Sequence, residues 1–489
     1  MNAPHPHVAP LQFVDPRRFK ANTREAVDDA HLRQSFRGAM DFLQSRRGAH
    51  FGAHGGTQAG NSAAFETLRR LGEGIRQYSL SRLPHLLELL EQRLTERGVQ
   101  VHWAANADEA NAIFLAIARA HDATGMIKGK SMVSEEIELN HRMAEQGVDC
   151  LESDMGEYIV QLAGERPSHI IMPAIHKTKQ QIAQLFADEI PDTPYTEDVD
   201  ALIAIGRRVL RNEFRDAKIG VSGVNFMVAE TGTLCLVENE GNGRMCTTVP
   251  EVHIAITGIE KVVESFEQVL PLYSLLTRSA TGQAITTYFN VISGPRRAGE
   301  LDGPNEMHLV LLDNGRSQAY QDADLRPTLQ CIRCGACMNH CPVYARIGGL
   351  AYGTTYPGPI GSIISPHLLG LEATQDLPTA SSLCGACAEV CPVGIPIPDL
   401  LMQLRRAAKH DADAGHLPLV GQARARDWKE LLAWKAWAWL SERPALYRAA
   451  IQLGRWLRPV TPPWQGGWTA HRTPLQLARR GLRERLADR

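Results

Sequence analysis

The sequence predicts an α/β domain, then an α-helical cysteine-rich domain, then a helical tail rich in Trp and Arg. Over the first two-thirds of the chain, short apolar runs alternate with stretches of helical periodicity. This alternation is typical of a layered fold with a mostly parallel sheet. Seven of the ten cysteines lie between Cys331 and Cys391, and seven of the eight tryptophans lie within residues 428–468.

Hydrophobic periodicity predicts the elements of the α/β domain. Five leucines keep the spacing of one face of a helix that ends near Gly98, namely Leu83, Leu86, Leu87, Leu90 and Leu94. Ser134 is predicted to cap another helix, whose first turn contains Glu135 and Glu136. Further helices are predicted over 109–121, 177–187 and 201–214. Strands are predicted over 101–104, 169–173 and 308–312, with two β-rich runs joined by a turn within 219–237.

The composition excludes several classes of protein. The chain has 489 residues, of which 44% are hydrophobic and 22% are charged, so it can bury a core and is not wholly disordered. No apolar run approaches the ~18 residues of a membrane-spanning helix. The N-terminus shows no secretory signal, so we expect a cytoplasmic protein. A formal net charge of −2 argues against a nucleic-acid binder.

Changes in composition divide the chain into four expected parts. An N-terminal arm covers 1–64, the α/β domain 65–315, the cysteine-rich domain 316–410 and the tail 411–489. Residues 421–489 contain 14 Lys and Arg against 5 Asp and Glu, so this end of the chain is strongly basic.

The cysteines form two related motifs. The first is C-x2-C-x2-C-x3-C-P, the spacing with which bacterial ferredoxins hold [4Fe–4S] clusters. The second repeats the latter part, C-x2-C-x3-C-P, with Ser381 at the position of the first cysteine. In ferredoxins the cysteine before the proline reaches the other cluster. The predicted ligands are Cys331, Cys334, Cys337 and Cys391 for one cluster, and Cys341, Cys384 and Cys387 for the other.

The second site lacks one thiolate, which leaves its cluster type open. It can be [3Fe–4S], or [4Fe–4S] with a non-cysteine or external ligand, for which Ser381 is a candidate. Two zinc knuckles are the alternative, but zinc ribbons usually pair two CxxC units across a longer gap. The isolated Cys150, Cys235 and Cys246 are interpreted as buried, unreactive thiols.

Two polar segments of the α/β domain are weaker candidates for ligand binding. The segment 128–131 resembles the end of a phosphate-binding loop, but Thr124 stands where the first glycine belongs, so no nucleotide hydrolase is predicted. This basic turn can still bind an anion, or its lysines can be solvated. The turns 229–233 and 238–244 flank a strand, and such turns at a sheet edge either bind ligands or simply connect elements.

The combination of these motifs resembles the lactate-utilisation protein B (LutB) family of iron–sulfur proteins. The similar stretches are 127–140, 226–244, 253–263, 331–344 and 381–401. The resemblance implies an N-terminal LUD domain with a NagB/RpiA/CoA-transferase-like fold, a two-cluster ferredoxin-type domain and a LutB-type C-terminal part. It also implies two partners in oxidising L-lactate to pyruvate: a cysteine-rich CCG-domain protein (LutA-like) and a small LUD protein (LutC-like).

Three functions are therefore weighed. The first is an iron–sulfur electron-transfer subunit of an L-lactate dehydrogenase complex, in which a partner or a shared site performs the two-electron step, since no flavin or nicotinamide fingerprint is visible. The second is a CoA-transferase-like or small-molecule-binding enzyme with structural clusters and a catalytic carboxylate, Glu230 or Glu135. The third is an assembly scaffold whose tail docks partners.

The tail itself allows three interpretations. Residues 426–440 are apolar almost all round if helical, apart from Lys429 and Lys435. Such a helix is buried in its own protein, bound to a partner or placed at a membrane surface. Trp with Arg is favoured both at protein interfaces and at anionic membranes, and the basic charge favours an acidic partner or anionic lipid over burial of the outer face, so self-packing, a partner and a peripheral membrane contact all stay open.

Overall fold

The computed structural model describes residues 15–51, 63–409, 421, 424 and 428–460, and a few residues beyond these: 462–465, 469, 473–475, 478–481 and 486. The chain forms two compact units, Met1–Arg424 and Ala425–Arg489. The first unit contains the α/β part and the cysteine-rich part, and the second contains the basic tail.

A six-stranded parallel sheet forms the centre of the α/β part, in the order β1-β10-β7-β4-β2-β3. The strands are β1 (Gln100–Ala104), β2 (Gly125–Lys128), β3 (Asp149–Glu152), β4 (Ile219–Gly223), β7 (Val252–Gly258) and β10 (Glu306–Leu312). Its central strands are buried on both faces, because side chains alternate between two packed layers: Val310 contacts one apolar cluster, while Leu309 and Leu311 contact another.

A second, four-stranded sheet has the order β8-β5-β6-β9. Its strands are β5 (Phe226–Val228), β6 (Thr233–Glu238), β8 (Val262–Val263) and β9 (Tyr288–Ile292). The turn 229–233 joins β5 to β6. Gly232 has a φ of +58° there, and a Cβ at this position would lie 2.7 Å from Cβ of Arg93. This turn therefore packs closely on a neighbouring helix, which explains its small residue.

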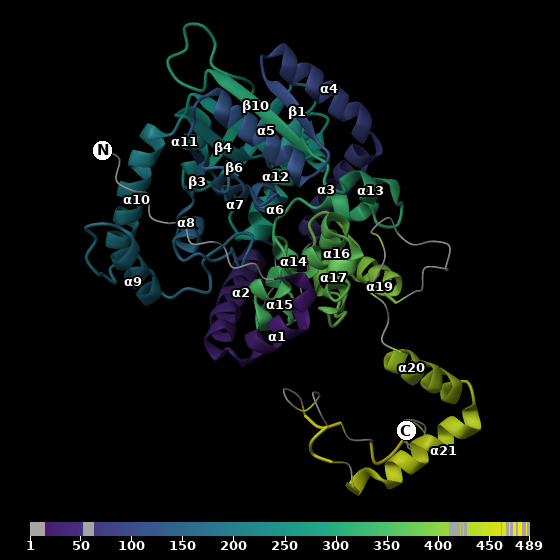
Figure 1. The fold of residues 1–489 in the computed structure, drawn as a ribbon. Coiled ribbons are helices and arrows are strands. Elements are labelled where there is room, and N and C mark those ends of the chain that lie inside the picture. Colours follow the sequence, from purple (N-terminus) through teal and green to yellow (C-terminus); the bar gives the residue numbers. More distant parts are fainter. Residues whose placement is uncertain are drawn as a thin grey trace. The chain divides into compact units, whose positions relative to one another are not determined.

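Helices cover both faces of the parallel sheet (Figure 1). The apolar face of α4 packs between the two sheets, and α5 to α7 cover the opposite face of the parallel sheet. The helices of this part are α3 (Ala63–Ser81), α4 (Leu83–Glu96), α5 (Ala107–Ala120), α6 (Met132–Glu136), α7 (Leu139–Ala144), α8 (Met155–Leu162), α9 (Lys179–Glu189), α10 (Val199–Asp216), α11 (Asn242–Thr248), α12 (Phe266–Ala280) and α13 (Arg316–Gln321).

Short helices and loops build the cysteine-rich part. They are α14 (Ala336–Asn339), α15 (Tyr344–Ile347), α16 (Gly358–Leu369), α17 (Leu371–Thr374), α18 (Ala386–Glu389) and α19 (Ile397–Ala407). Helical turns of the 3-10 type occur throughout the described chain, both in the cysteine-rich part and outside it: η1 (Pro16–Arg18), η2 (Ile259–Lys261), η3 (Arg326–Gln330), η4 (Leu350–Tyr352), η5 (Leu377–Thr379) and η6 (Arg458–Val460).

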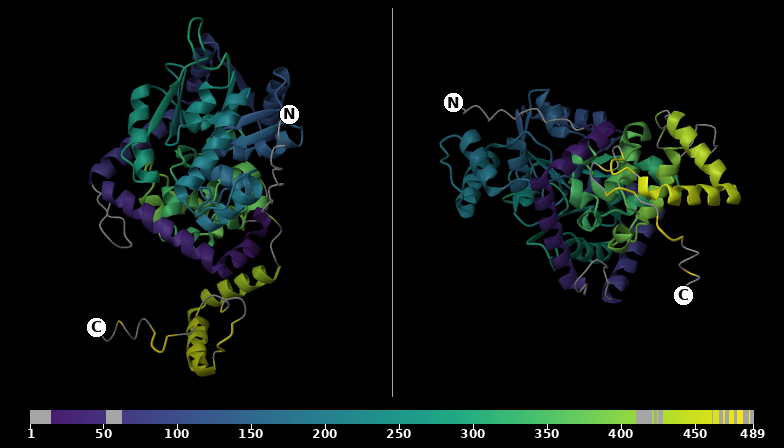
Figure 2. Two further views of the ribbon diagram at one scale, coloured as in Figure 1. Left: turned by 90° about the vertical axis from the view of Figure 1, so that its left-hand side faces the viewer. Right: turned by 90° about the horizontal axis from the view of Figure 1, so that it is seen from below.

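The expected N-terminal arm is helical where the structure describes it. Helices α1 (Phe19–Asp28) and α2 (Ala30–Phe51) pack against the cysteine-rich part, more than 300 residues away in sequence (Figure 2). Phe36 stacks edge-on with Tyr344 at a centroid distance of 5.5 Å. The weak sequence pattern did not indicate these helices, because their apolar side chains contact a surface formed far along the chain.

Three of the expected elements are wrong in detail. Residues 169–173 form an irregular loop and not a strand: Nδ1 of His169 accepts the backbone N–H groups of Ile171 (3.0 Å) and Met172 (3.1 Å), which competes with sheet pairing. Ser131, and not Ser134, caps α6, because its hydroxyl accepts the N–H of Ser134 at 3.3 Å. The segment 219–237 contains three strands rather than two.

The second unit contains two described helices, α20 (Trp428–Ser441) and α21 (Pro444–Trp456). Neither helix has a buried residue. The tryptophans of α20 are each 52–64% exposed, at positions Trp428, Trp434, Trp437 and Trp439. Within the second unit, these tryptophans are therefore not buried by the other described residues of the tail.

Candidate iron–sulfur site

The two cysteine motifs share one local backbone conformation. Arg333 and Leu383, each directly before a cysteine, have positive φ angles of 62° and 56°. The following Gly335 and Gly385 also have positive φ, at 75° and 87°, and each begins a one-turn helix, α14 or α18. These conformations turn the chain tightly, so that side chains three residues apart converge on one point.

The side-chain atom at the first position of each motif accepts the same hydrogen bond. Sγ of Cys331 accepts the N–H of Arg333 at 3.3 Å. Oγ of Ser381 accepts the N–H of Leu383 at 3.1 Å. The serine oxygen thus occupies the place in the second motif that a cysteine sulfur occupies in the first.

The structure places thiols of the two motifs near one another. Cys391, from the second motif, lies within electrostatic range of Cys331 and Cys334. Cys341, from the first motif, lies within electrostatic range of Cys384 and Cys387. The last cysteine of each motif, which precedes a proline, therefore lies near thiols of the other motif. Cys337 also lies within electrostatic range of Cys387, so the two groups of thiols adjoin.

The chemistry of these thiols fits iron–sulfur clusters. Burial, together with neighbouring thiols, raises the pKa of Cys337 well above its ordinary value, and burial raises that of Cys334 and Cys387 to about 12. Crowded, buried thiols ionise readily only beside a compensating cation, which cluster iron provides. The three other buried thiols, Cys150, Cys235 and Cys246, also have a pKa raised to about 12 by burial and lie outside the two motifs, as expected.

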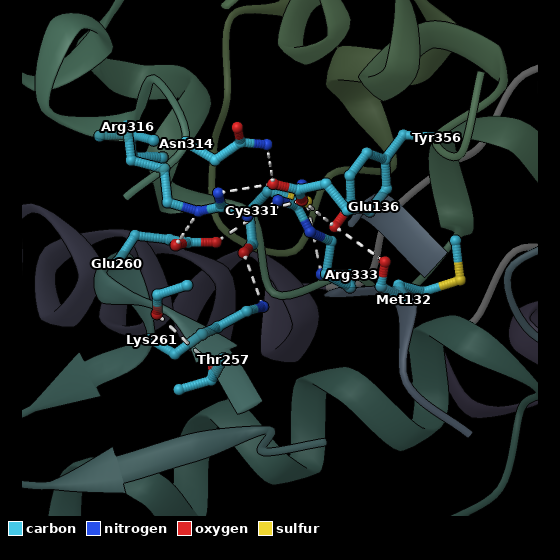
Figure 3. A network of polar contacts seen from close by, with 12 residues as sticks. Met132, Glu136, Thr257, Glu260, Lys261, Asn314, Arg316, Cys331, Arg333 and Tyr356 are labelled. Atoms are coloured by element: carbon cyan, nitrogen blue, oxygen red, sulfur yellow. Dashed lines mark hydrogen bonds and ion pairs between the residues drawn. The ribbon is translucent and has the colours of Figure 1, made fainter. Parts of the chain in front are cut away.

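A buried network of charges links the first motif to the parallel sheet (Figure 3). Arg316 pairs with Glu260 at 2.7 Å and with Glu136 at 2.8 Å. Glu260 also pairs with Arg333 at 3.4 Å, and the hydroxyl of Tyr356 donates to Glu136 at 2.7 Å. Burial alone would raise the pKa of Glu260, but the adjoining cations, Arg316 foremost, lower it to about 2.

Two further cations hold the loop that enters the first motif. The guanidinium of Arg76, on α3, donates to the carbonyls of Leu329 at 3.0 Å and Gln330 at 3.3 Å. Nζ of Lys261, after β7, donates to the carbonyl of Cys331 at 3.3 Å (Figure 3). Burial and the adjacent Arg333 lower the pKa of Lys261 to about 7. Sequence reasoning missed these residues, since single charges in the α/β part give no motif.

A cavity of about 280 Å³ lies where the α/β part meets the first motif. It opens at the carboxyl ends of β2, β4 and β7, where folds with parallel sheets place ligands. Both weak sequence signals contribute to its lining, through the segments that include Lys130 and Asn242, and so do Lys261, Arg333 and Tyr356. The two turns touch: a Cβ on Gly129 would lie 3.3 Å from Cα of Gly243.

The lysines of the segment 128–131 are not freely solvated. Lys128 is fully buried and pairs with Glu135 at 2.8 Å and with Glu152 at 2.6 Å, so its charge is already matched. Lys130 donates to the carbonyl of Ile171 at 3.0 Å and keeps 24% of its side chain exposed. Of this pair, only Lys130 lines the cavity.

The two candidate catalytic carboxylates are not brought to this cavity. Glu135 is engaged by Lys128, and Glu230 is exposed on the turn that packs against Arg93. Neither lines the cavity. The arrangement therefore does not favour a covalent carboxylate mechanism at either residue.

Comparisons with known proteins agree with the expected domains and with iron–sulfur clusters in the cysteine-rich part. The family model for the LUD domain matches residues 87–312, that for a 4Fe-4S dicluster domain matches 328–395, and that for the C-terminal part of lactate utilisation protein B matches 403–489. The chain thus carries a two-cluster [4Fe–4S] domain after an α/β LUD domain. Within the described residues, no helix has both the length and the apolar character needed to cross a bilayer.

Curated relatives align over most of the chain. "Lactate utilization protein B" of Bacillus velezensis is 41% identical over 431 residues, 88% of this chain and 86% of the relative. The protein of the same name from Bacillus subtilis is 42% identical over 79% of each chain. "Uncharacterized electron transport protein YkgF" of Escherichia coli is 40% identical over 89% of this chain and 87% of the relative.

Proposed function

Because the chain belongs to the lactate utilisation protein B family, we propose that it is the iron–sulfur electron-transfer subunit of a multi-protein system that oxidises L-lactate to pyruvate. The observation that supports the proposal is that thiols of the two motifs lie near one another, Cys391 near Cys331 and Cys341 near Cys384. Iron–sulfur clusters accept and release single electrons, and such an arrangement keeps two of them close together.

The ligand sets follow from this arrangement. Cys331, Cys334, Cys337 and Cys391 hold the first cluster, and Cys341, Cys384 and Cys387 hold the second. Ser381 faces the open coordination position of the second cluster, because its oxygen accepts the hydrogen bond that a ligand sulfur accepts in the first motif. The second cluster is then either trinuclear or a cubane with a non-cysteine ligand.

The surroundings of the two sets suggest a direction for electron flow. The first set lies beside the cavity of the α/β part, through Arg333 and Lys261. The second set includes Cys384, the one exposed thiol of the ten. Electrons enter near the cavity and leave at the exposed second cluster, toward a partner protein.

Two partner proteins complete the system in this proposal. One is a CCG-domain cysteine-rich protein and the other a small LUD protein, as the resemblance implies. The exposed tryptophans of α20 and the basic character of the second unit support docking of the tail onto an acidic surface of a partner. An anionic membrane is the alternative contact for the same surface.

The decisive experiment is reconstitution of the complex. The protein, purified without oxygen, is combined with both partners, and L-lactate-dependent reduction of a dye is measured. Activity should require all three proteins and disappear when Cys384 is replaced by Ser, because the exit cluster is then damaged. Dye reduction that survives removal of this subunit would reject the proposal.

The tail gives a separate test of docking. Truncation after Ala425 should leave the visible absorbance of the clusters intact, since Met1–Arg424 is a compact unit of its own. The truncated protein should co-purify more weakly with its partners. Co-purification at the wild-type ratio would argue against docking, and binding of the full chain to anionic vesicles would favour the membrane.

A further inference from the structure

The carboxylates that line the cavity beside the first motif accept hydrogen bonds from the surrounding turns. Glu238 accepts backbone N–H groups from Gly243 at 2.7 Å and Arg244 at 2.8 Å, and the amide of Asn290 at 2.9 Å. Glu240 accepts the N–H of Met155 at 3.2 Å, and Asp154 accepts that of Glu157 at 3.1 Å. These acidic groups hold the surrounding turns of the lining.

The cations of the same cavity have donor capacity that the protein does not use. An ammonium group has three N–H donors, and Nζ of Lys261 meets one recorded acceptor in the described part of the chain, the carbonyl of Cys331. Arg333 pairs with Glu260 through Nη2, while its buried Nε and Nη1 lack a hydrogen-bond partner among the described residues. Buried donors of this kind normally find an acceptor.

The lining also includes a neutral donor. Asn225 lies just after β4 and lines the cavity. Its Oδ1 accepts the N–H of Val237 at 2.8 Å, which leaves the amide Nδ2 directed to other partners. The lining therefore combines the cations Lys261 and Arg333 with a neutral donor and with apolar side chains that include Ile256 and Leu276.

We propose that this cavity binds a small organic acid anion, whose carboxylate is received by Lys261 and Arg333. Because the cavity measures about 280 Å³, the ligand is limited to a small molecule. The choice among organic acids rests on the proposed function, which points to a 2-hydroxy or 2-oxo acid with its second oxygen at Asn225. The LUD domain is then a binding domain that presents this anion to the first cluster.

The position of Lys261 couples binding to the first cluster. Its ammonium group contacts the carbonyl of Cys331, a predicted ligand of that cluster. A bound carboxylate partly neutralises the positive charge of Lys261 and Arg333. The electrostatic potential at the first cluster is then less positive, which makes that cluster harder to reduce. Binding should therefore lower the midpoint potential of the first cluster and leave that of the second almost unchanged.

Calorimetric titration of the holoprotein under anaerobic conditions tests the proposal. L-lactate and pyruvate should each bind at one site, and lactamide, a neutral analogue of lactate, should bind at least tenfold more weakly. Lys261→Met should weaken lactate binding at least tenfold. The matched control is Lys179→Met, which removes a lysine with 53% of its side chain exposed and should leave binding unchanged.

A second variant guards against misfolding of the buried Lys261→Met protein. Thr281→Trp places a large side chain in the lining from the end of α12 and changes no predicted cluster ligand. It should abolish binding while the iron content and cluster spectrum stay normal. Equal binding of lactate and lactamide, no binding by either acid, or normal binding by Thr281→Trp protein with intact clusters would overturn the proposal.

The outcome is distinguishable from that of the proposed function. Binding without lactate-dependent dye reduction in the reconstituted complex would retain the site and reject the electron-transfer role. Dye reduction without binding to this subunit would retain that role and place the organic acid on a partner.

Discussion

The two cysteine motifs have the same local backbone but different surroundings. In the first, the residue before the second cysteine is Arg333, whose side chain is nine-tenths buried and paired with Glu260. In the second, the equivalent residue is Leu383, which is 38% exposed beside the exposed Cys384. The repeated loop therefore gives both motifs a similar backbone, while the rest of the chain determines the burial and the charge around each loop.

Charge is the clearest difference between the two sets. Arg76, Arg333 and Lys261 all lie within electrostatic range of Cys331. The raised pKa values of Cys341 and Cys387 instead arise from burial and other thiols, with backbone amides acting in the opposite direction. The first site is thus built into a charged interior, and the second is placed where a partner can reach it.

Replacing the equivalent cysteine ligand in each motif should give the largest difference between the two sites, in cluster content and in stability. Cys334→Ser should lose the first cluster, about half of the iron, and should also lower the thermal stability because that thiol belongs to the main apolar core. Cys384→Ser, at the exposed equivalent position, should lose only the second cluster. Iron and sulfide analysis with electron paramagnetic resonance measures the loss of each cluster in the two variants. An equal loss of thermal stability in Cys334→Ser and Cys384→Ser would contradict the comparison.

The buried charge network should account for the next largest effect. Glu260→Gln leaves Arg316 and Arg333 short of a counter-charge in the interior, which should cost about 3–5 kcal/mol of stability. The control is Glu264→Gln, which breaks a pair with Arg82 in which both side chains are at least one-third exposed, at a cost below ~1 kcal/mol. Urea denaturation, followed by circular dichroism, measures both variants.

The same network predicts a pH dependence. The pKa of Glu260 is lowered from 4.5 to about 2 in the folded protein, so its contribution is fully present above pH 4.5. The contribution is lost as the pH falls from 4.5 toward 2, because the unfolded state then binds a proton that the folded state still excludes. The stability difference between wild type and Glu260→Gln should therefore narrow over this range, and a constant difference would contradict the assignment.

Exchange of the equivalent residues Arg333 and Leu383 should have a smaller effect, on the midpoint potentials of the two clusters. Arg333→Leu removes a buried positive charge beside the first cluster and should lower its midpoint potential by tens of mV, on the order expected for one nearby charge. Leu383→Arg should raise the potential of the second cluster by less, because solvent and salt screen an exposed charge. Redox titration measures both, with Leu383→Gln as the uncharged control.

Much of this fold could be predicted from the sequence, where the signal is local. The leucine spacing gave α4, and the alternation of apolar and helical stretches gave the α/β class, because both patterns depend on residues close together in the chain. The loop at 169–173 could not be predicted, since His169 turns apolar, strand-like residues into a loop through bonds to its own backbone neighbours.

The candidate site divides in the same way. The iron–sulfur character of the cysteine-rich part could be predicted because ferredoxin spacing is short and regular. The cavity could not, because its lining joins the turns around Lys130 and Asn242 to Arg333 and Tyr356, far apart in the sequence. The buried partners of Arg316 could not be predicted either. An isolated Glu136 or Glu260 has the sequence pattern of an ordinary surface charge, and only the folded sheet brings it to Arg316.

The smallest effect is expected at Ser381, the position where the two motifs differ in ligand type. Ser381→Cys should give the second motif its fourth thiolate, because the oxygen already accepts the hydrogen bond that Sγ of Cys331 accepts. Iron should rise by at most about one atom per chain, as a trinuclear cluster becomes a cubane. The first cluster's signal should not change. Ser381→Ala is the control: if the oxygen binds iron, this variant alters the second cluster's spectrum, and if both variants leave that spectrum unchanged, Ser381 faces no coordination position.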